Sequence, residues 1–172
     1  NLLKRLESSV ESFRLTLSAL RRNHQGTLAK IAAFNQSGVS ASVGDLTEVL
    51  ANLEGDDDEL PILDDESGEI GGKVKISLGD MDLPSWERDL KGDLELIDTL
   101  LASMNKITPE DDAKLQHLKA HVLEKIANPI NPGNKKVLIF TAFADTADYL
   151  YANLAPVLQE AHGLHTAKVT GK

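Results

Sequence analysis

The residues best placed to do chemistry follow a short apolar run near the carboxyl end of the chain. Residues 137–140 are continuously apolar, and Thr141, Ala142 and Phe143 come directly after them. An amphipathic pattern typical of a helix begins at Asp145. Because parallel α/β units bind ligands just beyond the carboxyl ends of their strands, residues 141–143 are placed for recognition or catalysis.

Two other groups have the residue types that bind metal ions. His117 and His121 are four positions apart, which puts two imidazoles on one side of a helix, but no third ligand accompanies them in the sequence. The run of aspartates at 56–58 lacks the alternating ligands, the central glycine and the closing glutamate of an EF-hand loop. We therefore predict a surface histidine pair, a solvated acidic loop and no metal site.

The sequence lacks the usual motifs of self-contained catalysis. It has no Gly-x-x-x-x-Gly-Lys-Ser/Thr phosphate loop, no Gly-x-Gly-x-x-Gly and no Gly-x-Ser-x-Gly elbow. It has no cysteine, which excludes a thiol nucleophile and a disulfide framework and fits a reducing cytoplasm. We predict no catalytic residue and no cofactor bound by this chain.

A single parallel β-α-β unit would position residues 141–143. Residues 136–141 are predicted to form a strand, residues 145–162 a helix and residues 166–170 a second strand. A right-handed crossover would place the second strand beside the first. Pro156 predicts a kink, or a helix end near Ala155.

The rest of the chain is predicted to be helical. Apolar residues recur every three or four positions in three stretches, of which the last is expected to begin at Thr108-Pro109. The fold class is therefore mostly α: a helical bundle or helical hairpins, followed by an incomplete parallel β-α-β unit. The predicted buried positions are Leu3, Leu6, Val10, Phe13, Leu17 and Leu20; Leu90, Leu94, Ile97 and Leu101; and Leu115, Leu118, Val122 and Ile126.

The net charge of −9 is concentrated in one segment. Residues 45–69 contain eleven acidic and no basic residues, whereas residues 1–24 contain five basic and two acidic residues. We predict a mobile acidic loop at about 54–72. No apolar run is long enough to span a membrane and no signal peptide is visible, so we expect a cytoplasmic protein without a membrane partner. The two ends lead us to expect an internal fragment of a longer protein.

The segment Lys136-Val-Leu-Ile-Phe-Thr-Ala-Phe143, followed by Asp145-Thr-Ala-Asp-Tyr-Leu150, resembles the start of the second RecA-like lobe of superfamily two helicases. The resemblance is to the Swi/Snf-type DNA-dependent ATPases in particular. Val169-Thr170-Gly171 is similar to the turn after the next strand of that lobe, and residues 1–22 are similar to a segment downstream of the first lobe in bacterial members. The resemblance covers about residues 1–22 and 108–172, so residues 23–107 are interpreted as an insertion.

The resemblance implies a nucleic-acid-binding track. Thr141, Phe143, Thr170 and Gly171 would contact the backbone, and Arg5 and Arg14 would add phosphate contacts. The parent would be a helicase or translocase that binds ATP and Mg²⁺ and acts on nucleic acid, double-stranded DNA in particular. Its phosphate loop and arginine finger belong to parts outside this chain, so the chain alone would not hydrolyse ATP.

The resemblance also divides the chain. Residues 1–107 would form a helical linker and insertion, and residues 108–172 the start of the second lobe. The expected partners are nucleic acid, the first helicase lobe and a second copy of the isolated chain.

Two other interpretations stay open. The chain could be a helical protein–protein interaction module, or an insertion-bearing piece of an unrelated α/β enzyme. In the simplest structural interpretation, Thr141 stabilises the approach to the following helix, Phe143 packs beneath it, and the basic residues form a solvated helix face.

Overall fold

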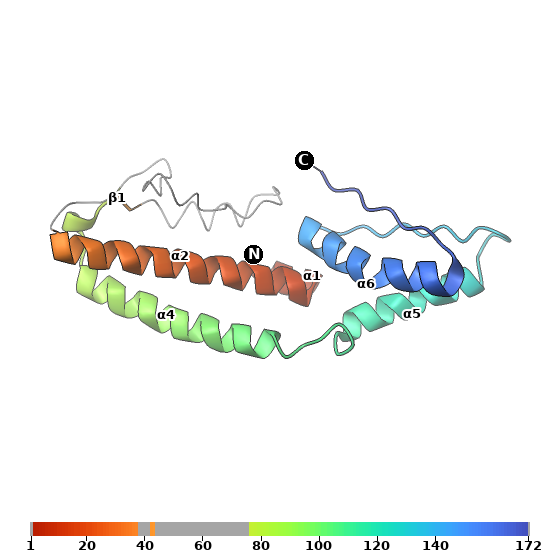
Figure 1. Ribbon diagram of the computed structural model, residues 1–172, viewed down its shortest axis with the longest axis horizontal. Helices are drawn as coiled ribbons and strands as arrows, with labels where there is room; N and C mark the ends of the chain where they lie inside the picture. The colour runs from red at the N-terminus through yellow and green to blue at the C-terminus, as the bar shows by residue number, and fades with distance from the viewer. Residues whose placement is uncertain (1, 38–41, 44–75, 172) are drawn as a thin grey trace. The chain divides into compact units, whose positions relative to one another are not determined.

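The computed structural model describes residues 2–37, 42–43 and 76–171 (Figure 1). These residues are mostly helical, which confirms the prediction of a mostly α chain. The predicted acidic loop at 54–72, including the aspartates at 56–58, lies outside the described residues. The described elements are α1 (Leu2–Ser8), α2 (Val10–Ser37), β1 (Ser42–Val43), β2 (Ile76–Ser77), η1 (Leu78–Asp80, a 3-10 helix), α4 (Leu83–Met104), α5 (Ala113–Ala127) and α6 (Ala144–His162).

The chain divides into two compact units. One unit contains Leu15–Ser103 together with Asn1–Leu2, and the other joins Leu3–Arg14 to Met104–Lys172. Residues 3–14 thus fold with the carboxyl-terminal part of the chain, whereas the sequence grouped them with residues 15–107.

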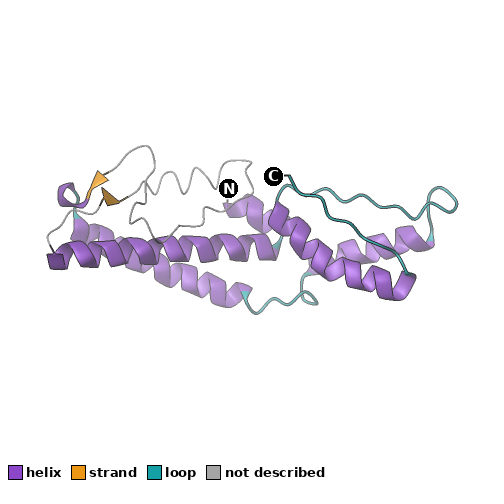
Figure 2. Ribbon diagram, turned by 45° about the horizontal axis from the view of Figure 1, so that its top comes forward, coloured by secondary structure: helices purple, strands orange, loops and turns teal. Residues whose placement is uncertain are grey.

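The first unit is a helical hairpin. Most of α2 lies beside α4 (Figures 1 and 2), and the two helices are antiparallel because Arg21 pairs with Asp98 while His24 lies next to Asp93. β1 and β2 form a two-residue antiparallel ladder. The buried core of this unit consists of Ile31, Leu78, Leu83 and Leu90, with Leu28, Phe34, Met81 and Trp86 packed against it.

The amino-terminal helix breaks at Ser9, which corrects the predicted continuous apolar stripe. The Ser9 hydroxyl accepts a hydrogen bond from the Ser12 N–H at 3.0 Å and so caps the start of α2. Leu3 is 72% exposed and Leu6 is 40% exposed, whereas Arg5 is only 3% exposed. The stripe fails in α1 because a new helix begins after Ser9, and because the polar face of α1 has buried partners.

In the second unit, α5 starts later than predicted. Asp112 is its N-cap, and its carboxylate accepts the N–H groups of Lys114 and Leu115, both at 3.0 Å. Thr108 instead belongs to a preceding turn, in which its hydroxyl donates to Asp111. The helix α6 does not end at Pro156 but continues to His162, after which Gly163 takes a left-handed conformation with φ of 61°.

The two predicted strands are not formed. Residues 136–141 and 166–170 have no strand assignment, although both run as extended chain toward the amino-terminal end of α6 (Figure 1). The side chains of the first segment alternate as they would in a strand, with Leu138 83% and Phe140 90% exposed against 38% for Val137 and 42% for Ile139. A ladder needs a neighbouring strand, and the described residues place none against either segment.

Candidate nucleic-acid interface

The site is built around the turn that enters α6. The Thr141 hydroxyl donates a hydrogen bond to the Phe143 carbonyl at 2.9 Å, which closes the turn on itself. Phe143 is the N-cap residue of α6 and makes no side-chain cap bond. The hydroxyl of Thr141 therefore shapes the turn that the sequence predicted to contact a nucleic-acid backbone.

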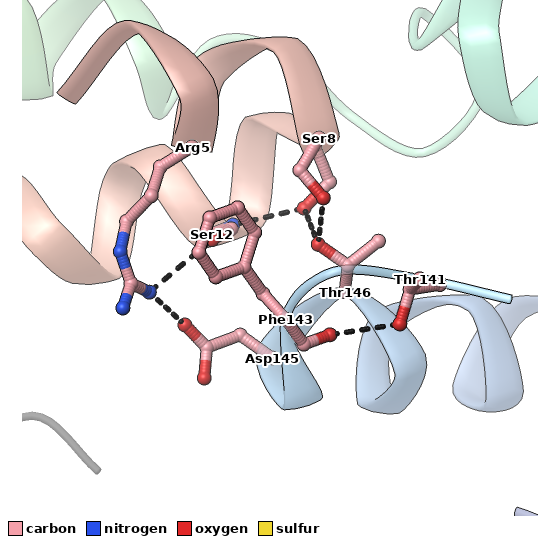
Figure 3. A network of polar contacts seen from close by, with 8 residues as sticks. Arg5, Ser8, Ser12, Thr141, Phe143, Asp145 and Thr146 are labelled. Carbon is pink, nitrogen blue, oxygen red and sulfur yellow. Dashed lines mark hydrogen bonds and ion pairs between the residues drawn. The ribbon is translucent and has the colours of Figure 1, made fainter. Parts of the chain in front are cut away.

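The helix α1 holds this turn through Arg5 (Figure 3). Arg5 Nη1 donates to Asp145 Oδ2 at 2.8 Å and to Ser12 Oγ at 3.4 Å. The Arg5 guanidinium also lies over the Phe143 ring, 4.6 Å from its centre. Arg5 thus contacts both the N-cap residue of α6 and a carboxylate in its first turn.

A second set of contacts joins the α1–α2 junction to α6. The hydroxyl of Thr146 lies 2.7 Å from that of Ser8 and 3.1 Å from that of Ser9 (Figure 3). Thr146 and Ser9 are buried, at 4% and 5% exposed. The start of α6 is therefore held by the Arg5–Asp145 ion pair and by the contacts of the Thr146 hydroxyl with Ser8 and Ser9.

Arg14 also has protein partners. Its guanidinium donates to Glu11 at 2.6 Å and to the carbonyls of Met104 and Ile107 at 3.1 and 3.2 Å. Arg5 and Arg14, the two side chains predicted to contact phosphate, therefore bind protein groups. Both connect segments that are far apart in the sequence.

Thr170 and Gly171 lie at the end of the second extended segment. Both are exposed. Figures 1 and 2 show that this segment and the segment before Thr141 both reach the amino-terminal end of α6. Thr141 and Phe143 thus lie at the start of α6, and the segment that ends in Thr170 and Gly171 runs toward the same end of that helix.

A cavity of about 410 Å³ opens beside the Thr141 turn. Its lining includes Thr141 and Ala142 of the turn, Lys114 and His117 of α5, and Tyr149 of α6. The Tyr149 hydroxyl donates to Asp112 Oδ2 at 3.1 Å. Burial, with the negative charge and the hydrogen bond of Asp112, raises the pKa of Tyr149, so its phenol stays a neutral donor.

His117 and His121 both border this cavity. Their rings meet edge to face, with centroids 4.5 Å apart. Within the described residues, no group of three histidine, aspartate or glutamate side chains has a metal-binding arrangement. The sequence identified the spacing of the pair but missed its position next to Thr141, because that proximity depends on how α5 packs beside residues 139–142.

A second hollow, a groove of about 660 Å³, is lined by both extended segments together with α5 and α6. Its helical lining is apolar and includes Val122, Ile126, Leu150 and Leu154. Leu138, Phe140 and Val169 on the extended segments are 83%, 90% and 92% exposed. Exposed apolar side chains beside unpaired extended backbone are typical of surfaces that join a sheet or another chain.

We predict that the purified chain self-associates through these segments. Replacing Phe140 with aspartate should lower the concentration-dependent increase in mass measured by sedimentation velocity, because it puts a charge on the exposed apolar face. Replacing Leu96, which is 60% exposed on α4, with aspartate is the matched control and should leave association unchanged. A wild-type chain that sediments as a monomer at all concentrations would contradict this prediction.

None of the described helices combines the length and the apolar character needed to cross a membrane. Comparison of the chain with protein-family models, with curated proteins and with solved structures gives no match.

Proposed function

We propose that this chain is part of an ATP-driven, helicase-like motor that acts on nucleic acid, double-stranded DNA in particular. It contributes the helical region between the two lobes and the start of the second RecA-like lobe. ATP and Mg²⁺ are bound by other parts of the parent protein. The two extended segments become neighbouring parallel strands when the rest of the lobe pairs with them.

One observation carries the proposal. The resemblance rests on two blocks, residues 1–22 and 108–172, which are far apart in the sequence. The structure packs most of the first block onto the second, because residues 3–14 and 104–172 form one compact unit. The contact includes a nearly buried ion pair between Arg5 and Asp145, at 3% and 16% side-chain exposure. This contact supports the proposal, because a connecting segment that leads into the second lobe is expected to pack on that lobe.

The proposal divides the predicted site residues by role. Thr141, Phe143, Thr170 and Gly171 contact the nucleic-acid backbone through main-chain N–H groups and the Thr170 hydroxyl, which bind phosphates without reading sequence. The Thr141 hydroxyl donates to the Phe143 carbonyl and keeps the turn in shape. Arg5 and Arg14 hold the turn and the α4–α5 connection in place. Residues 15–103 are an inserted helical unit.

The proposal predicts weak, salt-dependent binding of duplex DNA by the chain, and no ATP hydrolysis above background with or without DNA. Replacing Thr141 with valine keeps the side-chain shape but removes the hydroxyl. Its affinity for DNA, measured by fluorescence anisotropy at low salt, should fall about 2- to 10-fold, because the turn loses the hydrogen bond to the Phe143 carbonyl that shapes it.

The matched control is Thr99 of α4, whose exposed hydroxyl donates to the Glu95 carbonyl within its own helix. Replacing Thr99 with valine should leave DNA affinity unchanged. The proposal fails if the chain binds no DNA at low salt, or if it hydrolyses ATP and loses that activity when one of its own residues is altered.

A second candidate is a protein-interaction module. The apolar residues exposed on the extended segments, Leu138, Phe140 and Val169, favour it. A chain that self-associates but binds no DNA would support this candidate over the motor.

A further inference from the structure

We propose that the cavity beside Thr141 binds a phosphate group of the nucleic-acid backbone, with Lys114, His117 and His121 as its basic residues. This inference rests on the proposed function and extends its track from the turn to the surface of α5. Neither the motifs nor the resemblance assigned a role to these three residues.

The charge of the cavity lining favours an anion. Lys114, His117 and His121 are its basic residues. The hydroxyls of Thr141 and Tyr149 also line it but donate their hydrogens to the Phe143 carbonyl and to Asp112. Among the described residues that line the cavity, the carboxylate is Asp112. An anion that enters therefore meets three basic side chains and one carboxylate.

The Asp112 carboxylate already accepts hydrogen bonds from the protein. Asp112 is 7% exposed. Its Oδ1 accepts the N–H groups of Lys114 and Leu115 at 3.0 Å, and its Oδ2 accepts the Tyr149 hydroxyl at 3.1 Å. The Asp112 carboxylate thus accepts three hydrogen bonds from the protein. These bonds partly offset its negative charge and weaken its repulsion of a phosphate in the cavity.

The ammonium of Lys114 binds backbone carbonyls. Its ammonium donates to the carbonyls of Glu7 and Ser8, the second at 3.1 Å, at the carboxyl-terminal end of α1. Carbonyl groups bring partial charges but no full negative charge. Lys114 thus supplies a fixed cation where the turn, α1 and α5 meet.

The two histidines are open to a ligand. Both are exposed, and their edge-to-face contact stacks the rings without joining their nitrogens. Glu124 Oε2 lies 4.0 Å from His121 Nδ1, beyond hydrogen-bond distance. At about 410 Å³ the cavity falls within the range of about 300–1,000 Å³ that is usual for ligand sites, which leaves room for a phosphodiester.

The test follows the imidazole resonances of the protein by NMR while a short DNA duplex is added at constant pH. The chain has five histidines. We expect the signals of His117 and His121 to shift saturably, with the dissociation constant that anisotropy gives. Signals of His24, His162 and His165, which lie outside the cavity lining, should not follow this curve. Inorganic phosphate should compete at millimolar concentration.

Variants give the second readout. The double substitution His117→Gln and His121→Gln should weaken DNA binding about tenfold and lower the salt-dependence slope, as loss of a phosphate contact does. His162→Gln is the matched control and should bind like the wild type. Both variants change exposed side chains, and their helix content is checked by circular dichroism.

The outcomes separate this inference from the proposed function. DNA that binds without moving the His117 and His121 signals would overturn the cavity site and leave the motor proposal standing. A chain that binds inorganic phosphate here but no DNA would overturn both, because the cavity would then serve a different anion. The absence of any binding would also refute both.

Discussion

Replacing Arg5 with methionine is expected to lower the free energy of unfolding of the unit that contains α1, α5 and α6 by about 3 kcal/mol. Methionine keeps most of the side-chain volume but removes the charge. Asp145, at 16% side-chain exposure, then loses the partner that lies 2.8 Å from its carboxylate. Removing one member of a buried pair is costly because the other charge stays desolvated and unpaired.

The measurement is hydrogen exchange of the α6 amides, because it reports on this unit alone. Protection should fall most in the first turn of α6, where Asp145 and Thr146 are held. Because Arg5 also covers the Phe143 ring, the variant should weaken DNA binding together with stability. Unchanged protection of α6 would contradict a structural role for Arg5.

Two controls isolate the contribution of the pair. The double variant that combines Arg5→Met with Asp145→Asn should recover part of the loss, because the unpaired charge is gone. Replacing Arg88 with methionine breaks an ion pair with Asp89 whose members are 74% and 65% exposed. That change should cost less than about 0.5 kcal/mol, since exposed pairs contribute little.

The contacts of Arg5 could not be predicted from the sequence. Arg5 and Asp145 are 140 positions apart, and nothing in either local pattern joins them. The resemblance implied that Arg5 contacts phosphates, and the alternative was a solvated helix face. The break at Ser9 alters this, since it ends the apolar stripe and α1 then turns its polar face inward. A single serine that caps a new helix has only a weak local signal.

The buried faces of the long helices could be predicted because they depend on local spacing. Leu90 and Ile97 of α4, and Leu115, Val122 and Ile126 of α5, are buried as expected. The first residue of α5 could not be predicted from the sequence, since Thr108 and Asp112 both have side chains that can cap a helix. Only Asp112 also receives a hydrogen bond from Tyr149, a tertiary contact.

The predicted strands failed for a different reason. Residues 136–141 have the apolar content and the alternating exposure of a strand, which is why the local pattern predicted one. A strand is nevertheless defined by pairing with a neighbour, and the described residues supply none for this segment. The cavity next to Thr141 was missed for a related reason, because Lys114, His117 and Thr141 meet only after the helices pack.

The core of the first unit gives the second large expected effect. Replacing Leu90 with alanine should lower the free energy of unfolding of this unit by about 3 kcal/mol. Leu90 is 3% exposed and belongs to a cluster with Ile31, Leu78 and Leu83, which come from three different elements. Truncating the side chain leaves a cavity where α2, η1 and the start of α4 meet, and rigid helices collapse into such a space only partly.

Trp86 allows the effect to be measured in this unit directly. It is the single tryptophan of the chain, and it packs against the cluster that contains Leu90. Its fluorescence during urea denaturation should show an earlier midpoint for the Leu90→Ala variant. Leu96 lies on the same helix at 60% exposure, so Leu96→Ala is the matched control and should shift the midpoint little. Equal shifts for the two variants would mean that the contacts around Leu90 do not stabilise this hairpin, and residues 15–103 would then lack the core that makes them a folded insertion.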